Sequence, residues 1–395
     1  MTPRTPTPTY TPTPVGQTPA PTPTPTPFVA STFTPTPLAT PPHPTPTPPP
    51  SAGGGTGGGS RPRIIRDVEG SKDVSTTAGT LGTNAALATL TLLLLVASAE
   101  LFNKTVEENH NWFKRSFRVI FGPIEAAAAR LHDWSGESMA GMFGAPLGLL
   151  AMGALIYGIA EPGFGVNGKS IVVLVSVLTS LVVLTYFYNG AQIVVSNQLG
   201  VPTVMRLFPV GIAFALISVA LTRLDGFQPL VIYGFIASTV ALGGLERSRE
   251  QDGQTIFFPA LAMVGLCLGA WLLLDPARTL ANDHSSVLAA LPEAIVAGVL
   301  VGGLEGMFFQ MVPLRYLDGH KVWQWNKAAW LLAAGATAFL TWEILLNRES
   351  SLSSAVSHGT PEVAVIAMVV CFGLTLALYA FFRFRNALVS AEAKA

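Results

Sequence analysis

Residues 171–195 read IVVLVSVLTSLVVLTYFYNGAQIVV, a stretch in which no side chain carries a charge. About 20 apolar residues in a helix are enough to cross the ~30 Å hydrocarbon core of a bilayer. Backbone polar groups in lipid must be paired within the segment itself, which favours a helix over an isolated strand. This stretch therefore predicts a transmembrane helix, and with it a membrane protein.

Further apolar stretches extend this prediction over most of the chain. The 395 residues are 50% hydrophobic and only 12% charged, whereas about 25% of the residues in soluble domains are charged. The fourth and fifth stretches are short, so they form either two spans or one re-entrant pair. We predict an all-α fold, a polytopic transmembrane helix bundle of about nine spans, at residues 82–102, 143–160, 171–195, 210–224, 229–244, 256–274, 291–312, 328–346 and 363–382.

The N-terminal segment has a composition that cannot build a core. A Thr-Pro repeat is followed by the Gly-rich stretch SAGGGTGGGS. Repeated proline removes backbone donors and favours polyproline II, so this tail is either an extended surface stalk or a plain disordered segment. The predicted divisions are a disordered Thr/Pro-rich tail and linker (1–60), a juxtamembrane segment (61–80), the first transmembrane helix (81–102), a cytoplasmic interfacial helix (103–142), the transmembrane bundle (143–386) and a cytoplasmic C-terminal tail (387–395).

The placement of Lys and Arg predicts the orientation of the bundle. Loops on the cytoplasmic side of membrane proteins are enriched in these residues. With nine spans and the N-terminal tail outside, most of the 23 Lys and Arg residues fall on the inner side. We therefore expect a multi-pass protein of the plasma membrane with an extracellular N-terminal tail and a cytoplasmic C-terminus.

Two groups of residues indicate contact with membrane lipids. Lys114, Arg115 and Arg118 lie among phenylalanines after the first predicted span. That mixture predicts an amphipathic helix on the inner leaflet, with a connector helix packed on the bundle as the alternative. Trp323 and Trp325 are typical of an interfacial aromatic belt.

Two short motifs contain the polar residues of greatest interest. Residues 310–319 read QMVPLRYLDG and place Asp318 at the mouth of an apolar run. A carboxylate there is costly, which marks it as a functional candidate. Residues 188–192 read YNGAQ, and in a helix Tyr188 and Gln192 share one face. Asn189 is the third polar residue of this motif.

Together these motifs resemble those of the site-2 proteases, which are intramembrane zinc metalloproteases with H-E-x-x-H and N-x-x-P-x-x-x-L-D-G motifs. The resemblance implies a similar helical fold, with Tyr188 and Gln192 at ligand positions, Asn189 at the base position and Asp318 as the remaining ligand. The chain also looks like bacterial polytopic membrane proteins of no assigned function.

The chemistry of a zinc protease is missing from these positions. Such an enzyme needs three protein ligands and a carboxylate base. The chain has no H-E-x-x-H, and its six histidines lie outside the predicted spans. We therefore expect a degenerate site with no metal, no other cofactor and no assigned catalytic residue.

Other acidic and amide side chains lie inside predicted spans. Glu305 and Gln310 fall near one face of the span at 291–312. Three alternative roles are open to them: a proton relay, contact with a substrate, or hydrogen bonds to neighbouring helices. Glu161 and Glu343 lie near span ends and are expected to reach the membrane interface.

These observations favour a non-catalytic membrane protein that binds or scaffolds other membrane or surface components, or its own copies, and carries the tail. The alternative is an active intramembrane metalloprotease with atypical ligands, drawn from Asp318, Glu305 or His320. A transporter or channel is the third hypothesis, based on the short pair of segments. Zero net charge and the lack of a phosphate loop predict neither nucleic acid nor nucleotide as a partner.

Overall fold

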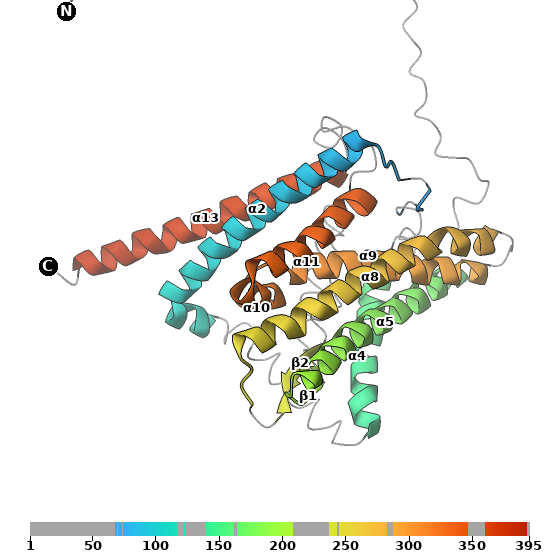
Figure 1. Cartoon of the computed structure of the whole chain (residues 1–395), viewed down its shortest axis with the longest axis horizontal. Coiled ribbons are helices and arrows are strands. Elements are labelled where there is room, and N and C mark those ends of the chain that lie inside the picture. The colour runs from blue at the N-terminus through green and yellow to red at the C-terminus, as the bar shows by residue number, and fades with distance from the viewer. Residues whose placement is uncertain are drawn as a thin grey trace, which may run out of the picture. The chain divides into compact units, whose positions relative to one another are not determined.

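A computed structural model describes Val68 and residues 70–72, 74–116, 122, 139–161, 164–207, 237–242, 245–282, 287–346 and 360–392. Two units are distinguished, Met1–Gly55 and Thr56–Ala395. Every described element belongs to the second unit, and the predicted tail lies outside the described residues. The elements are α2 (Ala78–Glu108), α4 (Met139–Ala160), α5 (Gly168–Gln198), β1 (Thr203–Leu207), β2 (Ala237–Ala241), α8 (Arg249–Asn282), η2 (Val287–Ala290), α9 (Leu291–Gln310), α10 (Asp318–Trp325), α11 (Lys327–Leu340), η3 (Thr341–Leu346) and α13 (Thr360–Glu392) (Figure 1).

The helices confirm a multi-pass, mainly helical membrane protein. α4 contributes a shorter apolar stretch, Leu147–Ile159. The predicted span at 210–224 and most of that at 229–244 lie outside the described residues, so the number of nine is not confirmed. Six described helices are long and apolar enough to cross a bilayer: Ala78–Glu108, Gly168–Gln198, Arg249–Asn282, Leu288–Gln310, Lys327–Leu346 and Met368–Leu388.

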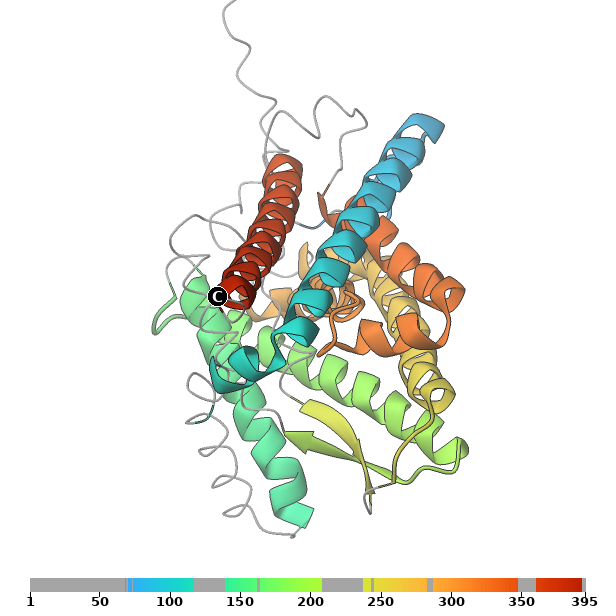
Figure 2. The ribbon, with the colours of Figure 1, turned by 90° about the vertical axis from the view of Figure 1, so that its left-hand side faces the viewer.

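The all-α prediction is wrong at one place, where two short strands pair beside α5 (Figure 2). β1 and β2 are antiparallel, with Thr203 opposite Ala241 and Leu207 opposite Ala237. β2 falls inside the segment predicted as the fifth span. Its Ser-Thr-Val centre suits a strand, and the ladder pairs backbone groups of a segment too short to span.

A tight turn at the end of α5 directs the chain into β1. Gly200 has φ 79°, a left-handed conformation that glycine adopts without steric cost. Val201 N–H donates to the Ser196 carbonyl at 2.9 Å. The hydroxyls of Ser196 and Thr203 are 2.7 Å apart. These bonds hold the strand pair against the C-terminal end of α5.

The helices pack in a continuous series, which Figure 1 shows from α13 to α4. α2 packs against α13 and α11, and α11 also contacts α8 and α9. α5 packs against α4, α8 and α9. Most of the buried apolar side chains form one cluster that includes residues of α5, α8 and α9, so the centre of the bundle lies among these three helices.

Glycines bring α5 and α9 close together. A Cβ at Gly298 would overlap Ser180 Oγ, and one at Gly302 would lie 3.1 Å from Leu184. Ser180 Oγ also lies 3.1 Å from the Ile295 carbonyl of α9. Both helices advance by four residues from the first contact to the second, so they run in the same direction. Small residues at such positions allow close packing of membrane helices.

Gly298→Ala is expected to lower the free energy of unfolding by about 1–3 kcal/mol, because Ser180 and α5 must move to admit the methyl group. Thermal unfolding in detergent micelles measures the loss. Gly265→Ala is the matched control, since a Cβ there meets nothing within 4 Å. That control is expected to be neutral or slightly stabilising. Equal losses in the two variants would contradict the close contact.

α2 and α13 extend beyond their predicted ends. α2 continues to Glu108, six residues past the predicted boundary at 102, because its last turns are buried against α13. Val106 and Phe113 form a small apolar cluster with Phe382. α13 continues through Glu392, into the predicted C-terminal tail. Residues 110–116 are largely helical, and most of the rest of the predicted interfacial helix lies outside the described residues.

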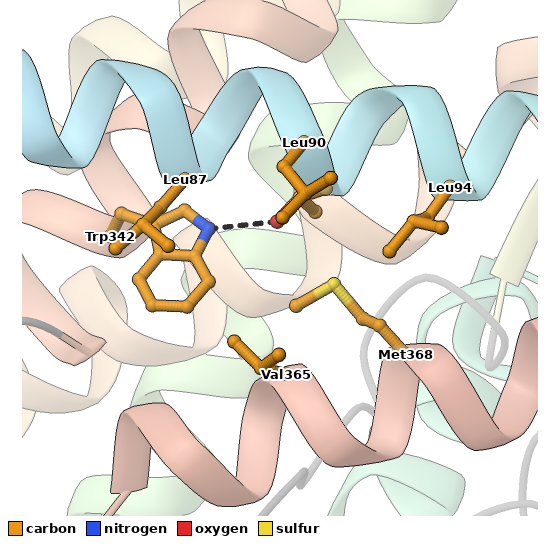
Figure 3. Close-up of a pocket in the computed structure, with 7 residues that line it drawn as sticks. Leu87, Leu90, Leu94, Trp342, Val365 and Met368 are labelled. Atoms are coloured by element: carbon orange, nitrogen blue, oxygen red, sulfur yellow. Dashed lines mark hydrogen bonds between the residues drawn. The ribbon is translucent and has the colours of Figure 1, made fainter. Parts of the chain in front are cut away.

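The π-helix η3 turns two consecutive side chains into the bundle. Trp342 Nε1 donates to Thr91 Oγ1 at 3.0 Å (Figure 3). Glu343 is 5% exposed and accepts a hydrogen bond of 2.6 Å from Asn84 Nδ2. The expectation that Glu343 reaches the membrane interface is therefore wrong. A π-turn changes the direction of side chains relative to an α-helix, and a helical projection could not show this.

A small cavity adjoins Trp342, between α2 and the start of α13 (Figure 3). Its volume is about 10 Å³, close to the minimum for one water molecule. The Thr91 hydroxyl in its wall is already bonded to Trp342. The cavity is therefore a packing defect and not a ligand site. Its other lining residues are Leu87, Leu90, Leu94, Val365 and Met368.

Candidate functional site

Asp318 is the first residue of α10, directly after the loop that leaves α9. Gly319 follows it, and a Cβ at Gly319 would overlap the backbone of Met311. The loop therefore folds back closely on the end of α9. The Asp318 side chain is 23% exposed, so the carboxylate lies at a partly open position near the C-terminal ends of α5 and α9.

Three side chains surround the Asp318 carboxylate. Lys321 Nζ lies 3.0 Å from Oδ1, an i,i+3 ion pair. Tyr188 Oη and Gln192 Nε2 each lie 3.4 Å from Oδ2. Tyr188 and Gln192 are buried, and both bonds are long. One carboxylate oxygen therefore faces a cation, and the other faces two neutral donors from α5.

The third polar residue of the YNGAQ motif is not part of this group. Asn189 Nδ2 donates to the Thr185 carbonyl at 2.8 Å, one turn back on its own helix. Gln192 instead extends the group, because its Oε1 accepts a hydrogen bond of 2.7 Å from Thr239 of β2. The strand pair thus covers the side of the site that α5 leaves open.

A second ion pair lies beside the first. Arg247 Nη1 is 3.8 Å from Asp252 Oδ1, and Arg247 Nη2 donates to Thr203 Oγ1 of β1 at 2.7 Å. The charge of Asp318, and to a smaller extent that of Asp252, raises the pKa of Lys321. Lys321 therefore keeps its positive charge beside two carboxylates.

Asn103 of α2 positions the loop that leads to Asp318. Its Nδ2 donates to the Pro313 carbonyl at 2.9 Å, and its Oδ1 accepts from Arg315 N–H at 2.8 Å. Neither Asn103 nor Thr239 nor Lys321 was predicted as a member of this group. For Lys321 the i,i+3 spacing to Asp318 was a usable signal. For Asn103 and Thr239 the sequence carries none.

His320, a ligand of the metalloprotease hypothesis, is engaged elsewhere. Its Nδ1 lies 3.2 Å from the Pro313 carbonyl, and its Nε2 lies 2.8 Å from Gln324 Nε2. Burial and the nearby charge of Arg315 lower the pKa of His320. The hydrogen bond to the Pro313 carbonyl raises it by less than these two effects lower it. A neutral ring that donates from Nδ1 to Pro313 and accepts from Gln324 fits both contacts.

The two intramembrane candidates of α9 differ in burial. Glu305 is half-buried. Gln310 is 4% exposed, and its Oε1 meets no hydrogen-bond partner among the described residues. Ser180 lies opposite Gly298 and Leu184 lies opposite Gly302. Continuing along α5 and α9 in the same four-residue steps places Gln192 opposite Gln310. Gln310 is therefore expected at the level of the Asp318 group.

The predicted lipid-facing residues have mixed surroundings. Lys114 and Arg115 are exposed, and Arg118 lies outside the described residues. Trp323 and Trp325 are half-buried. The Trp323 ring meets Trp330 edge-on at a centroid distance of 4.8 Å, so part of its surface packs inside the protein. The Trp325 ring lies 5.9 Å from that of Phe257.

The residues around Asp318 do not fit a catalytic zinc ion. A phenol and a carboxamide are poor ligands for zinc, and the Lys321 ammonium already faces Asp318 Oδ1 at 3.0 Å. Within the described ranges, no group of three or more His, Cys, Asp or Glu side chains could hold a metal ion. The arrangement suits hydrogen bonding and ion pairing.

Glu161, expected at the interface, forms an ion pair with Lys169 at 3.4 Å and is 13% exposed in its side chain. It lies between α4 and α5, at the other end of the bundle from Asp318.

Comparison with known proteins adds no further assignment to these residues. No family model, curated protein or solved structure matches the chain.

Proposed function

We propose that this chain is a non-catalytic multi-pass protein of the plasma membrane, with its N-terminal tail outside and its C-terminus inside. It binds or scaffolds another membrane component at its inner face. A site-2-protease-like ancestry accounts for the order and spacing of the YNGAQ and LDG motifs. One observation carries the proposal: Lys321 supplies the positive charge that neutralises Asp318.

The chemistry of the Asp318 group supports binding over catalysis. Asn189, at the base position of the resemblance, is bonded to its own helix and has no proton-accepting group. Tyr188 and Gln192 form neutral hydrogen bonds. Such a group holds helices and strands in a defined arrangement.

The strand pair beside this group supplies a surface for a partner. Among the described residues β1 and β2 pair only with each other, and the outer edges of such a strand pair carry backbone donors and acceptors that an added strand can use. An extended segment that adds to a strand edge is a common mode of peptide recognition. Val240 of β2 is 36% exposed, so it lies within reach of such a segment. We propose that the partner engages here.

A photo-crosslinking amino acid at Val240 tests this proposal in membranes. The expected result is a discrete crosslinked species that is absent when the same group is placed at Leu272, an exposed position on α8. Metal analysis of the purified full chain is expected to find far less than one zinc per chain. Stoichiometric zinc, together with peptide cleavage that is lost in Asp318→Ala, would overturn the proposal. Equal crosslinking from Val240 and Leu272 would show that the strand edge is not where the partner binds.

A further inference from the structure

The C-terminal ends of α2 and α13 lie side by side (Figure 1). Asn109, directly after α2, joins them through its Oδ1, which accepts from Arg385 Nη2 at 3.1 Å and from Asn386 Nδ2 at 3.2 Å. The Arg385 guanidinium also lies 4.7 Å from the centre of the Phe382 ring. Arg385 is therefore held in place, and the two helix ends form one rigid surface.

Two further cations lie on this surface and remain exposed. Lys104 Nζ of α2 lies 5.7 Å from the centre of the Tyr379 ring of α13. Arg383 is one helical turn after Tyr379, so it projects from the same face. Lys104 and Arg383 are both exposed, one from each of the two helices that meet at this junction.

Cations outnumber carboxylates in this region. Glu100, Glu107 and Glu108 are exposed on the last turns of α2 and offset part of the positive charge. The cations near the junction are Lys104, Lys114, Arg115, Arg383 and Arg385. The surplus is positive and lies on the side of the protein that the Lys and Arg distribution places in the cytoplasm.

Exposed aromatic rings surround the same cations. Trp112 is 46% exposed, Phe381 59% and Phe384 68%. Aromatic rings and cations together at one level are typical of the membrane interface. Only 6% of the transmembrane window of α13 is buried within the protein, so this helix offers a long apolar surface directly beyond the cations.

We propose that an anionic phospholipid binds at this junction. Its phosphate lies between Lys104 and Arg383, and its acyl chains follow the exposed face of α13 past Leu376 and Val369, which lie on the same face as Arg383. Charge complementarity selects the headgroup, since a guanidinium and an ammonium together suit a phosphate. The site uses no residue of the Asp318 group, so it is independent of the proposed function.

Native mass spectrometry of the delipidated full chain in detergent tests the proposal by titration with phosphatidylglycerol and, separately, phosphatidylcholine. We expect preferential binding of phosphatidylglycerol. Lys104→Gln/Arg383→Gln is expected to weaken it roughly 30-fold, since each cation near a lipid surface is worth about a factor of five. Lys72→Gln/Arg249→Gln removes two exposed cations elsewhere and is expected to bind as the unmodified chain does.

Three outcomes would overturn the site. Equal binding of the two lipids shows that no anion is selected. Equal weakening by the two double variants shows that only total charge matters. Displacement of the lipid by millimolar inorganic phosphate shows a site for a free anion. A thermal unfolding curve for each variant confirms that it is folded, and Arg383→Lys, which keeps the charge, is expected to recover most of the binding.

Discussion

Replacing Arg278 by methionine is expected to lower the free energy of unfolding by about 3–5 kcal/mol, because it leaves a buried carboxylate without its cation. Glu293 is 0% exposed at the start of α9, and its Oε1 lies 3.1 Å from Arg278 Nε. Its other oxygen, Oε2, has no hydrogen-bond partner among the described residues. Arg278 is therefore the counter-ion that compensates the buried Glu293 carboxylate.

The same substitution is expected to release the segment that precedes α2. Arg278 Nη2 donates to the Val68 carbonyl, and Ser71 Oγ donates to Asp275 Oδ2 at 2.9 Å on the same helix as Arg278. Thermal unfolding in micelles measures the loss of stability. Limited digestion with trypsin measures the release, as faster cleavage after the exposed Lys72.

Two variants control this experiment. Lys169→Met breaks the ion pair with Glu161. The Lys169 side chain is 26% exposed and that of Glu161 is 13% exposed. That pair is expected to contribute less than about 1 kcal/mol. Adding Glu293→Gln to Arg278→Met removes the unpaired charge, so the double variant is expected to recover part of the stability. A loss in Arg278→Met no larger than in Lys169→Met would show that Glu293 does not need Arg278.

Trp342→Ala is expected to cost about 3–5 kcal/mol, the usual range for removing a buried tryptophan. Trp342 is 1% exposed and packs against α2, where its Nε1 donates to Thr91 (Figure 3). The void left by the ring would join the small cavity already lined by Leu87 and Val365. Chemical unfolding in micelles gives the loss, and hydrogen exchange of α2 shows whether this helix loosens first.

Trp342→Phe separates packing from hydrogen bonding. It keeps an aromatic ring and loses the bond to Thr91, so a smaller loss of about 1 kcal/mol is expected. Trp112→Ala is the matched control at an exposed position and is expected to cost much less than Trp342→Ala. If α2 exchanged no faster in Trp342→Ala than in Trp112→Ala, η3 would not be what holds α2 in place.

The helical membrane character of the chain followed from its composition and apolar runs. The predicted spans at 171–195, 256–274 and 291–312 lie within or closely match α5, α8 and α9. Span ends were less accurate, because contacts between helices set them. α2 continues to Glu108, where burial of Thr105 and Val106 favours further turns that hydropathy alone does not require.

The candidate site was predicted in part. Tyr188, Gln192 and Asp318 do come together. Helical spacing predicted that Tyr188 and Gln192 share a face, and only the resemblance implied that Asp318 lies beside them. Asn189 does not join them, because its amide bonds to its own helix. Thr239 and Asn103 were missed, since a strand and a helix far away in the chain bring them to the site.

The sequence by itself determined the membrane character of this chain and the approximate position of most of its helices. Both follow from local quantities, namely the transfer of apolar residues into lipid and the pairing of backbone groups within a segment. Only the tertiary structure decided which polar groups satisfy each other. Asn84 and Glu343 are 259 residues apart, and no local pattern specifies such a pair. Close packing of helices selects it, because a buried carboxylate is tolerated only where a donor reaches it.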